Sequence, residues 1–127
     1  MTPVRMDRVE SGVRSIIAFT EAFNRHDLPT MLDLLSDDCI LEASSPPPDG
    51  AFYRGEAALS QFWQDCFKRW PNAHIKIEET AGFGLRCIVR WRCDWMDASS
   101  QPTHLRGVDL FRVQNGLIAE HFSYVKG

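Results

Sequence analysis

Two side chains near the C-terminus, Asp109 and His121, are of the types that move protons. They lie on either side of Asn115-Gly116, a dipeptide that tolerates positive φ and is typical of a tight β-turn. Residues 106–125 are rich in β-branched and aromatic side chains on both sides of this dipeptide, which predicts a β-hairpin. A carboxylate and an imidazole within hydrogen-bond distance can share one proton and serve as acid or base near neutral pH.

The length of the turn decides whether these two side chains meet, because a slip of one residue turns every side chain of a strand to the other face. A two-residue loop at Asn115-Gly116 puts Asp109 on the same face as Phe122. A three-residue loop over residues 114–116 puts Asp109 directly opposite His121, with the two Cβ atoms about 5 Å apart. The sequence pattern leaves both alternatives open.

We favour the three-residue loop because of the two faces that it produces. One face mixes aromatic with polar side chains, which is typical of a pocket wall. Its members are Asp109, Phe111, His121 and Ser123. The members of the other, apolar face are Val108, Leu110, Ile118, Phe122 and Tyr124. No helix is left in the sequence to cover this second face, so we expect a homodimer packed sheet to sheet through it.

The rest of the chain is predicted to build a support for the hairpin. Hydrophobic spacings of three and four predict helices over residues 7–24, from Leu28 to Leu35 and from Ala57 to Trp70, with Asp27 capping the second. Strands are predicted over residues 39–43, 75–80 and 85–96, before the two arms of the hairpin. Prolines 46–48 predict a surface loop, because proline cannot join a strand ladder.

This order of elements is typical of an α+β domain, a curved and mostly antiparallel sheet packed against three N-terminal helices. Such a sheet is expected to form a cone with a cavity. The aromatic side chains expected to line it, and to hold a flat apolar substrate, are Phe19, Trp63, Trp91, Trp95 and Phe111.

Composition narrows the possible functions. A chain of 127 residues with 44% hydrophobic residues is expected to be one domain, residues 1–127. A net charge of −3 and scattered arginines give no basic footprint for nucleic acid or an anionic membrane. No apolar run is long enough for a membrane span or a signal peptide, so we expect a cytoplasmic protein.

The four cysteines are scattered and have no histidine at ligand spacing. They are therefore expected to be buried free thiols, and no metal site is predicted. The sequence contains no glycine-rich phosphate loop, so no cofactor is predicted.

Three segments follow one another over nearly the whole chain. They are FNRHDLPTMLDLLSDDCILE, YRGEAALSQFW and GVDLFRVQNGLIAEHFSYV. In this order and spacing they resemble the nuclear transport factor 2-like superfamily of cone-shaped α+β folds, and within it the SnoaL-like group related to polyketide cyclases and ketosteroid isomerases. The fold carries enzymes and non-enzymes alike, so the resemblance by itself implies no single reaction.

The resemblance to ketosteroid isomerases can be followed position by position. Their catalytic aspartate base falls at Ala43, their oxyanion-hole tyrosine at Phe19 and the supporting tyrosine at Trp63. Their second oxyanion-hole acid falls at Asp109 and is retained. Since base and phenol are both missing, steroid isomerisation by that mechanism is not expected.

Limonene epoxide hydrolase is a second comparison within the same superfamily. Arg92 and Asp94 mimic its Arg-x-Asp spacing, but its last-strand aspartate falls at Ser123. The SnoaL-like cyclases, which use an aspartate as acid and base in an aldol ring closure, remain compatible with the sequence.

Three hypotheses for Asp109 and His121 stay open. The first is an isomerase- or lyase-like enzyme that transfers a proton next to a carbonyl of a small apolar or aromatic molecule. The second is a domain that binds such a molecule without catalysis. The third is a buried pair that only fills the cone, because carboxylate and imidazole satisfy each other's hydrogen bonds.

Overall fold

The computed structural model describes residues 3–126, and the backbone alone for residues 3–10; residues 1–2 and 127 of the predicted domain lie outside this range. In chain order the elements are α1 (Pro3–Asn24), α2 (Leu28–Asp33), β1 (Leu35–Ala43), β2 (Ala51–Arg54), α3 (Gly55–Arg69), β3 (His74–Phe83), β4 (Arg86–Met96), β5 (Pro102–Gln114) and β6 (Leu117–Lys126). The α+β prediction is confirmed. The short strand β2 was not predicted, since four residues give too little pattern to recognise.

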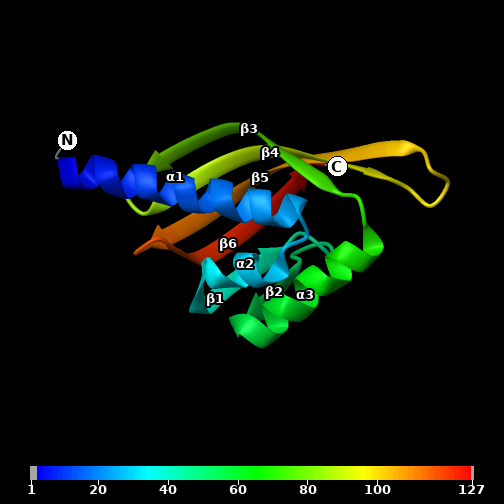
Figure 1. The fold of residues 1–127 in the computed structure, drawn as a ribbon, viewed down its shortest axis with the longest axis horizontal. Helices are drawn as coiled ribbons and strands as arrows, with labels where there is room; N and C mark the ends of the chain where they lie inside the picture. Colours follow the sequence, from blue (N-terminus) through cyan, green and yellow to red (C-terminus); the bar gives the residue numbers. More distant parts are fainter. Residues whose placement is uncertain (1–2, 127) are drawn as a thin grey trace.

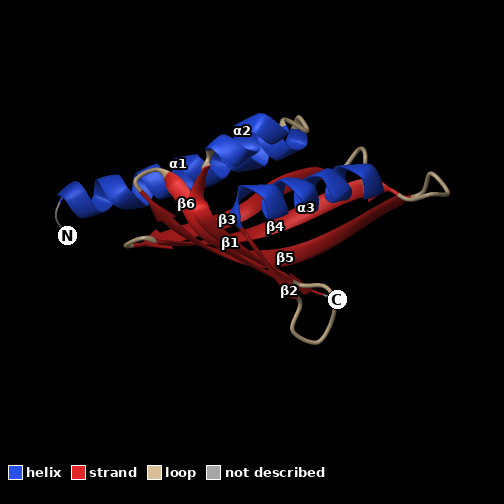
Figure 2. Cartoon of the chain, turned by 90° about the horizontal axis from the view of Figure 1, so that it is seen from below, coloured by secondary structure: helices blue, strands red, loops and turns tan. Residues whose placement is uncertain are grey.

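The six strands form one open sheet in the order β2-β1-β6-β5-β4-β3. Neighbouring strands are antiparallel, except that β1 runs parallel to β6. Helix α1 runs across one face of the sheet, and the β4–β5 hairpin projects beyond the other elements (Figure 1). Figure 2 shows that the strands curve and that the three helices lie on the same side of them. The curved sheet and the helices therefore enclose the core between them.

Strand β4 shows how the core changes along its length. The predicted alternation is confirmed, because Cys87 and Val89 on its inner face are buried. Further along the same face, Trp91, Cys93 and Trp95 are only half-buried. The interior thus opens to solvent toward the end of β4 that joins the projecting hairpin.

The second helix begins as predicted. The Asp27 carboxylate accepts hydrogen bonds from the backbone N–H and the hydroxyl of Thr30, and Pro29 lies in the first turn of α2. These bonds lower the pKa of Asp27. The following strand starts at Leu35, four residues before the predicted start, because Leu35 already pairs with Ile118 of β6. A partner so distant in the sequence leaves no local signal.

The turn of the C-terminal hairpin differs from the favoured prediction. Gln114 pairs with Leu117, so the loop has two residues, and the three-residue loop was wrong. Asn115 and Gly116 have φ values of 55° and 77°, the two positive angles that a two-residue hairpin turn of type I′ requires.

A β-bulge then restores the predicted faces. Val113 pairs with Ile118, whereas Arg112 pairs with Glu120, so Ala119 is an extra residue in β6. Beyond the bulge Phe111 lies opposite His121, and Asp109 lies opposite Ser123. Asp109 and His121 therefore share the inner face as predicted, but as diagonal rather than direct neighbours.

The bulge also moves one residue of the predicted outer face. Ile118 is fully buried with Val113 in the core, because it precedes the bulge and so points inward. The pairs Val108–Tyr124 and Leu110–Phe122 lie beyond the bulge and alternate with the buried Asp109. They keep their predicted place on the outer face.

Candidate functional site

Three adjacent strands bring together an indole, a carboxylate and an imidazole. Oδ2 of Asp109 on β5 lies 2.6 Å from Nε2 of His121 on β6. The other carboxylate oxygen, Oδ1, accepts a hydrogen bond of 2.8 Å from Nε1 of Trp91 on β4. Asp109 is 9% and His121 6% exposed, so both polar groups are buried. The two partners thus satisfy both oxygens of Asp109, as burial of a carboxylate demands.

The indole reaches Asp109 because the residue opposite Trp91 is a glycine. Gly107 pairs with Trp91 across β4 and β5. A Cβ atom at Gly107 would overlap Cζ2 of Trp91 and lie 2.7 Å from the backbone oxygen of Tyr124. The absence of a side chain therefore lets the indole lie across β5. The sequence pattern led to no prediction for Gly107, although a glycine inside a strand is a known signal for such a close approach.

Aromatic rings hold the imidazole of His121 in place. It lies nearly parallel to the rings of Phe111 and Trp63, at centroid distances of 4.3 and 6.2 Å. The ring of Phe19 meets it edge-on at 6.1 Å. With its Nε2 edge bonded to Asp109 and its faces against these rings, the imidazole has little freedom to turn.

The bond to Asp109 favours one tautomer of a neutral His121 when the carboxylate is ionised. An ionised carboxylate only accepts, so Nε2 of a neutral His121 donates to Asp109 and Nδ1 keeps its lone pair. Among the described residues Nδ1 has no hydrogen-bond partner. This arrangement can take up a proton at Nδ1 while Asp109 stabilises the resulting imidazolium.

Four of the five aromatic residues predicted for the cavity surround this pair. Phe19, Trp63 and Phe111 contact the imidazole, and Trp91 binds the carboxylate. Trp95 lies apart from them, where its ring is 5.7 Å from that of Trp70. The side chains of His121 and Asp109 keep only 8% and 13% of their surface exposed, so little of the pair is accessible from outside.

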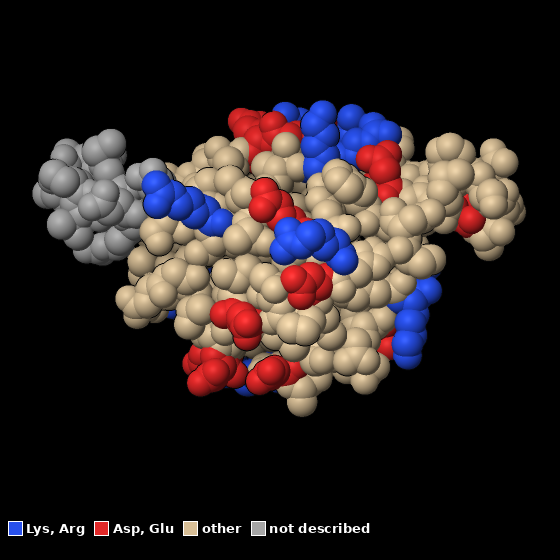
Figure 3. All heavy atoms as spheres, viewed as in Figure 1, with Lys and Arg blue, Asp and Glu red and all other residues tan. Residues whose placement is uncertain are grey.

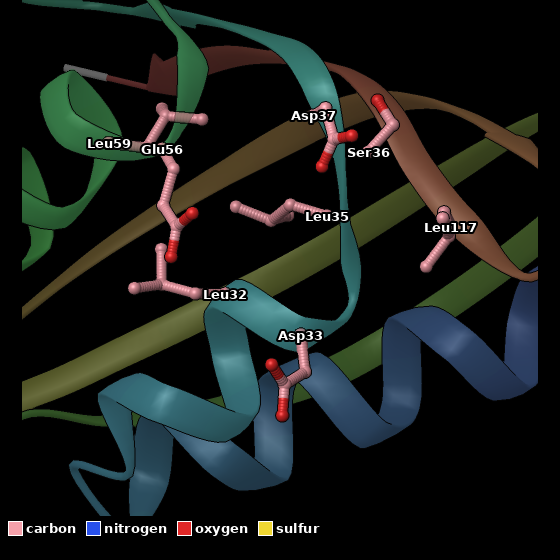
Figure 4. Close-up of a pocket in the computed structure, with 8 residues that line it drawn as sticks. All are labelled: Leu32, Asp33, Leu35, Ser36, Asp37, Glu56, Leu59 and Leu117. Atoms are coloured by element: carbon pink, nitrogen blue, oxygen red, sulfur yellow. The ribbon is translucent and has the colours of Figure 1, made fainter.

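Two hollows occur elsewhere on the surface. The first, of about 250 Å³, lies between α2, the start of β1 and α3, with carboxylates of Asp33, Asp37 and Glu56 around leucine side chains (Figure 4). The second, of about 340 Å³, lies between the C-terminal end of α3 and the end of β4 and includes Trp70 and Trp95. Neither hollow is lined by Asp109 or His121.

The four cysteines are free and have little capacity for chemistry. Cys39 and Cys87 are buried, and Cys66 and Cys93 are half-buried. Burial raises the pKa of Cys39, Cys66 and Cys93 to about 11, so they stay protonated at neutral pH. Within residues 3–126 no group of three or more His, Cys, Asp or Glu side chains is placed to hold a metal ion.

Arg92 and Asp94 bind each other on β4. The guanidinium donates to both carboxylate oxygens of Asp94, at 2.9 to 3.1 Å, and these bonds lower the pKa of Asp94. Both residues alternate with Trp91, Cys93 and Trp95 along the strand. They therefore face away from the Asp109–His121 pair, and the Arg-x-Asp spacing places no second acid beside it.

In the view of Figure 3 a group of basic side chains lies at the upper edge with acidic side chains beside it, and elsewhere on this face acidic and basic side chains are interspersed. In the described part of the chain, no helix is long and apolar enough to cross a membrane.

Comparisons with known proteins agree with this architecture. Residues 16–121 match the family model of the SnoaL-like domain. A nuclear transport factor 2-like protein of unknown function from Mesorhizobium loti is 37% identical, with 94% of each chain covered and a TM-score of 0.80. No curated protein matches the sequence.

Two more distant structures share the fold. One is IdmH from Streptomyces antibioticus, a proposed polyketide cyclase, with 20% identity, 91% of each chain covered and a TM-score of 0.79. The other is a Mycobacterium tuberculosis protein in complex with estradiol-17β-hemisuccinate, with 21% identity, 90% of this chain and 92% of that chain covered, and a TM-score of 0.76.

Proposed function

The chain belongs to the SnoaL-like domain family, and we propose that it is an enzyme that transfers a proton next to a carbonyl group. Its substrate is an apolar cyclic or aromatic molecule, and isomerisation, aldol cyclisation or dehydration follows the proton transfer. The observation that carries this proposal is the 2.6 Å bond between Asp109 and His121 inside an aromatic enclosure, with Nδ1 of His121 left without a partner.

His121 is the base in this proposal. Nδ1 removes a proton from the carbon next to the carbonyl, and the electron pair of that C–H bond passes to the carbonyl oxygen as an enolate forms. Asp109 holds the imidazole in position and stabilises its positive charge until the proton is returned. Trp91 fixes the carboxylate by binding its other oxygen. The rings of Phe19, Trp63 and Phe111 hold a flat substrate and exclude water.

Similarity of fold supports the choice of substrate class. The Streptomyces antibioticus neighbour is a proposed polyketide cyclase, and the Mycobacterium tuberculosis neighbour was solved with a steroid ester. Both have a fold like that of this chain. Cyclic and fused-ring ketones are therefore suitable compounds for a first test.

Hydrogen–deuterium exchange tests the proton transfer before the natural substrate is known. We expect the protein in D₂O to accelerate exchange at the carbon next to the carbonyl of at least one ketone in such a panel, measured by NMR. His121→Gln and Asp109→Asn should each reduce that rate by about a hundredfold or more. Retained exchange in folded His121→Gln protein, with folding checked by its NMR spectrum, would disprove the assignment of the base.

A second candidate function is ligand binding without catalysis. It is favoured because both carboxylate oxygens of Asp109 already have hydrogen-bond partners within the protein. A buried carboxylate with both oxygens satisfied can have a purely structural role. In that case a fused-ring ketone binds to the wild type and to both variants with similar affinity, and none of the three proteins accelerates exchange.

We also propose that the protein forms a homodimer through the outer face of the sheet. Figure 2 shows that the three helices of the described residues all lie on the opposite side of the sheet. A row of paired residues crosses five strands there, made up of Phe52, Glu42, Phe122, Leu110 and Ile88. Phe52 is 66% and Tyr124 53% exposed, which is unusual for large apolar side chains on a sheet without a partner.

Sedimentation at micromolar concentration tests the dimer, and Phe122→Glu should convert it to a monomer. A wild-type monomer would exclude this interface.

We also propose a cytoplasmic location for the protein. Its four unpaired cysteines are in keeping with a reducing compartment.

A further inference from the structure

We propose that the second hollow, here called the mouth hollow and defined by Arg69, Trp70, Trp95, Met96 and Asp97, binds the carboxylate end of a planar aromatic acid. The hollow has a volume of about 340 Å³ and lies where α3 ends beside the start of the β4–β5 loop. That volume is within the range of small-molecule sites.

Two indoles provide a surface for an aromatic ring. The rings of Trp70 and Trp95 lie 5.7 Å apart with an angle of 52° between them, and both side chains are half-buried. Met96 beside them is 42% exposed. Unlike Trp91, neither indole N–H has a hydrogen-bond partner among the described residues. The hollow thus combines partly exposed apolar rings with two donors that no described residue uses.

The lining of the hollow includes one basic and one acidic side chain, Arg69 and Asp97. The guanidinium of Arg69 lies 5.2 Å from the ring centre of Trp70, and it makes no ion pair within residues 3–126. The acid that lines the hollow, Asp97, is already engaged, because its Oδ1 accepts from the backbone N–H groups of Ser99 and Gln101. The hollow therefore offers donors and a cation, and its carboxylate is held by its own loop.

A planar aromatic carboxylate matches these features. Its ring can stack on an indole face, and its two oxygens fit the paired N–H groups of a guanidinium. Arg69 also complements the negative end of the α3 dipole, but that role does not require a position over a tryptophan ring.

The mouth hollow lies along the same strand face as the buried pair. Trp95 follows Trp91 by four residues on β4, which is roughly 13 Å of extended chain. A role for the hollow as the entrance for substrates of His121 depends on the proposed function. Binding of an aromatic acid there does not, so the two can be tested separately.

Titration with 2-naphthoate and its neutral amide, 2-naphthamide, tests this site. The protein has four tryptophans, so its four indole N–H signals can be assigned by NMR with single Trp→Phe variants. We expect 2-naphthoate to shift the signals of Trp70 and Trp95 and to bind about tenfold more tightly than the amide. Arg69→Gln should remove this preference, whereas Lys68→Gln, which removes the neighbouring exposed charge, should retain it.

Asp109→Asn separates the two proposals. Naphthoate binding that persists in this variant supports the mouth hollow, even if no ketone shows exchange. Equal affinity for acid and amide in the wild type, an unchanged preference in Arg69→Gln, or loss of naphthoate binding in Asp109→Asn would each overturn it. Shifts confined to the signals of Trp63 and Trp91 would overturn it as well.

Discussion

Strand β4 carries two tryptophans on one face, and their surroundings are opposite in character. Trp91 lies across a glycine and donates its N–H to a buried carboxylate. Trp95 lies opposite Thr103, packs at a tilt against Trp70 and leaves its N–H unused by the described residues. Residue type is therefore a poor guide to role here, and the cross-strand partner decides whether an indole binds a buried carboxylate or lines a surface hollow.

The largest effect is expected from filling the space above Gly107. Gly107→Val should lower the free energy of unfolding by about 3 kcal/mol, because the new side chain overlaps Trp91 and the backbone of Tyr124. Thr103→Val changes the matching position opposite Trp95 and should cost less than about 0.5 kcal/mol. Urea unfolding measures both values. Equal costs at the two positions would contradict the comparison.

A smaller difference is expected when each indole loses its N–H. Trp91→Phe leaves Oδ1 of Asp109 without its donor and should cost about 1–3 kcal/mol in urea unfolding, part of it from lost ring area. Trp95→Phe loses a similar area but no hydrogen bond within the described residues, so it serves as the control. If the Trp95 variant is destabilised as much as the Trp91 variant, the N–H bond to Asp109 contributes nothing.

A further, pH-dependent effect concerns the thiols between the two regions. Cys93 lies between Trp91 and Trp95, and burial raises the pKa of Cys93 and of Cys66 from 9.0 to about 11. Because the folded pKa is the higher one, their contribution to stability is complete below pH 9 and is lost as the pH rises toward 11. Urea unfolding at pH 8 and 10.5 should show this loss.

Replacing both cysteines with alanine is the control for that measurement. The double variant should lose less stability between pH 8 and 10.5 than the wild type does. Alkylation of the native thiols should also be slow, since a pKa of about 11 leaves about a hundredfold less thiolate at pH 8. Rapid alkylation of Cys93 in the folded protein would show that the Cys93 thiol is accessible to solvent and is not protected by burial.

Local pattern predicted the elements but not their long-range pairing. The alternation along β4 and the cap at Asp27 were correct, because both depend on neighbours in the sequence. The early start of β1 and the existence of β2 were missed, because both depend on pairing between strands that carry little pattern of their own.

The shared face of Asp109 and His121 was predicted by a partly wrong route. Asp109 and His121 share a face because the shorter turn and the extra Ala119 together shift the register by two residues, which preserves the alternation. The bond from Trp91 to Asp109 was not foreseen, although Gly107 was visible in the sequence. A glycine shows that space is needed, but it does not show which side chain fills it.

The bulge at Ala119 has a consequence for how this hairpin can evolve. A relative that gains one residue in the turn and loses the bulge would keep the acid and the imidazole on the same face, at the same overall chain length. An ungapped alignment of two such relatives would match the wrong residues between turn and bulge. Insertions and deletions in this hairpin are thus tolerated in compensating pairs, whereas a single one would turn His121 out of the interior.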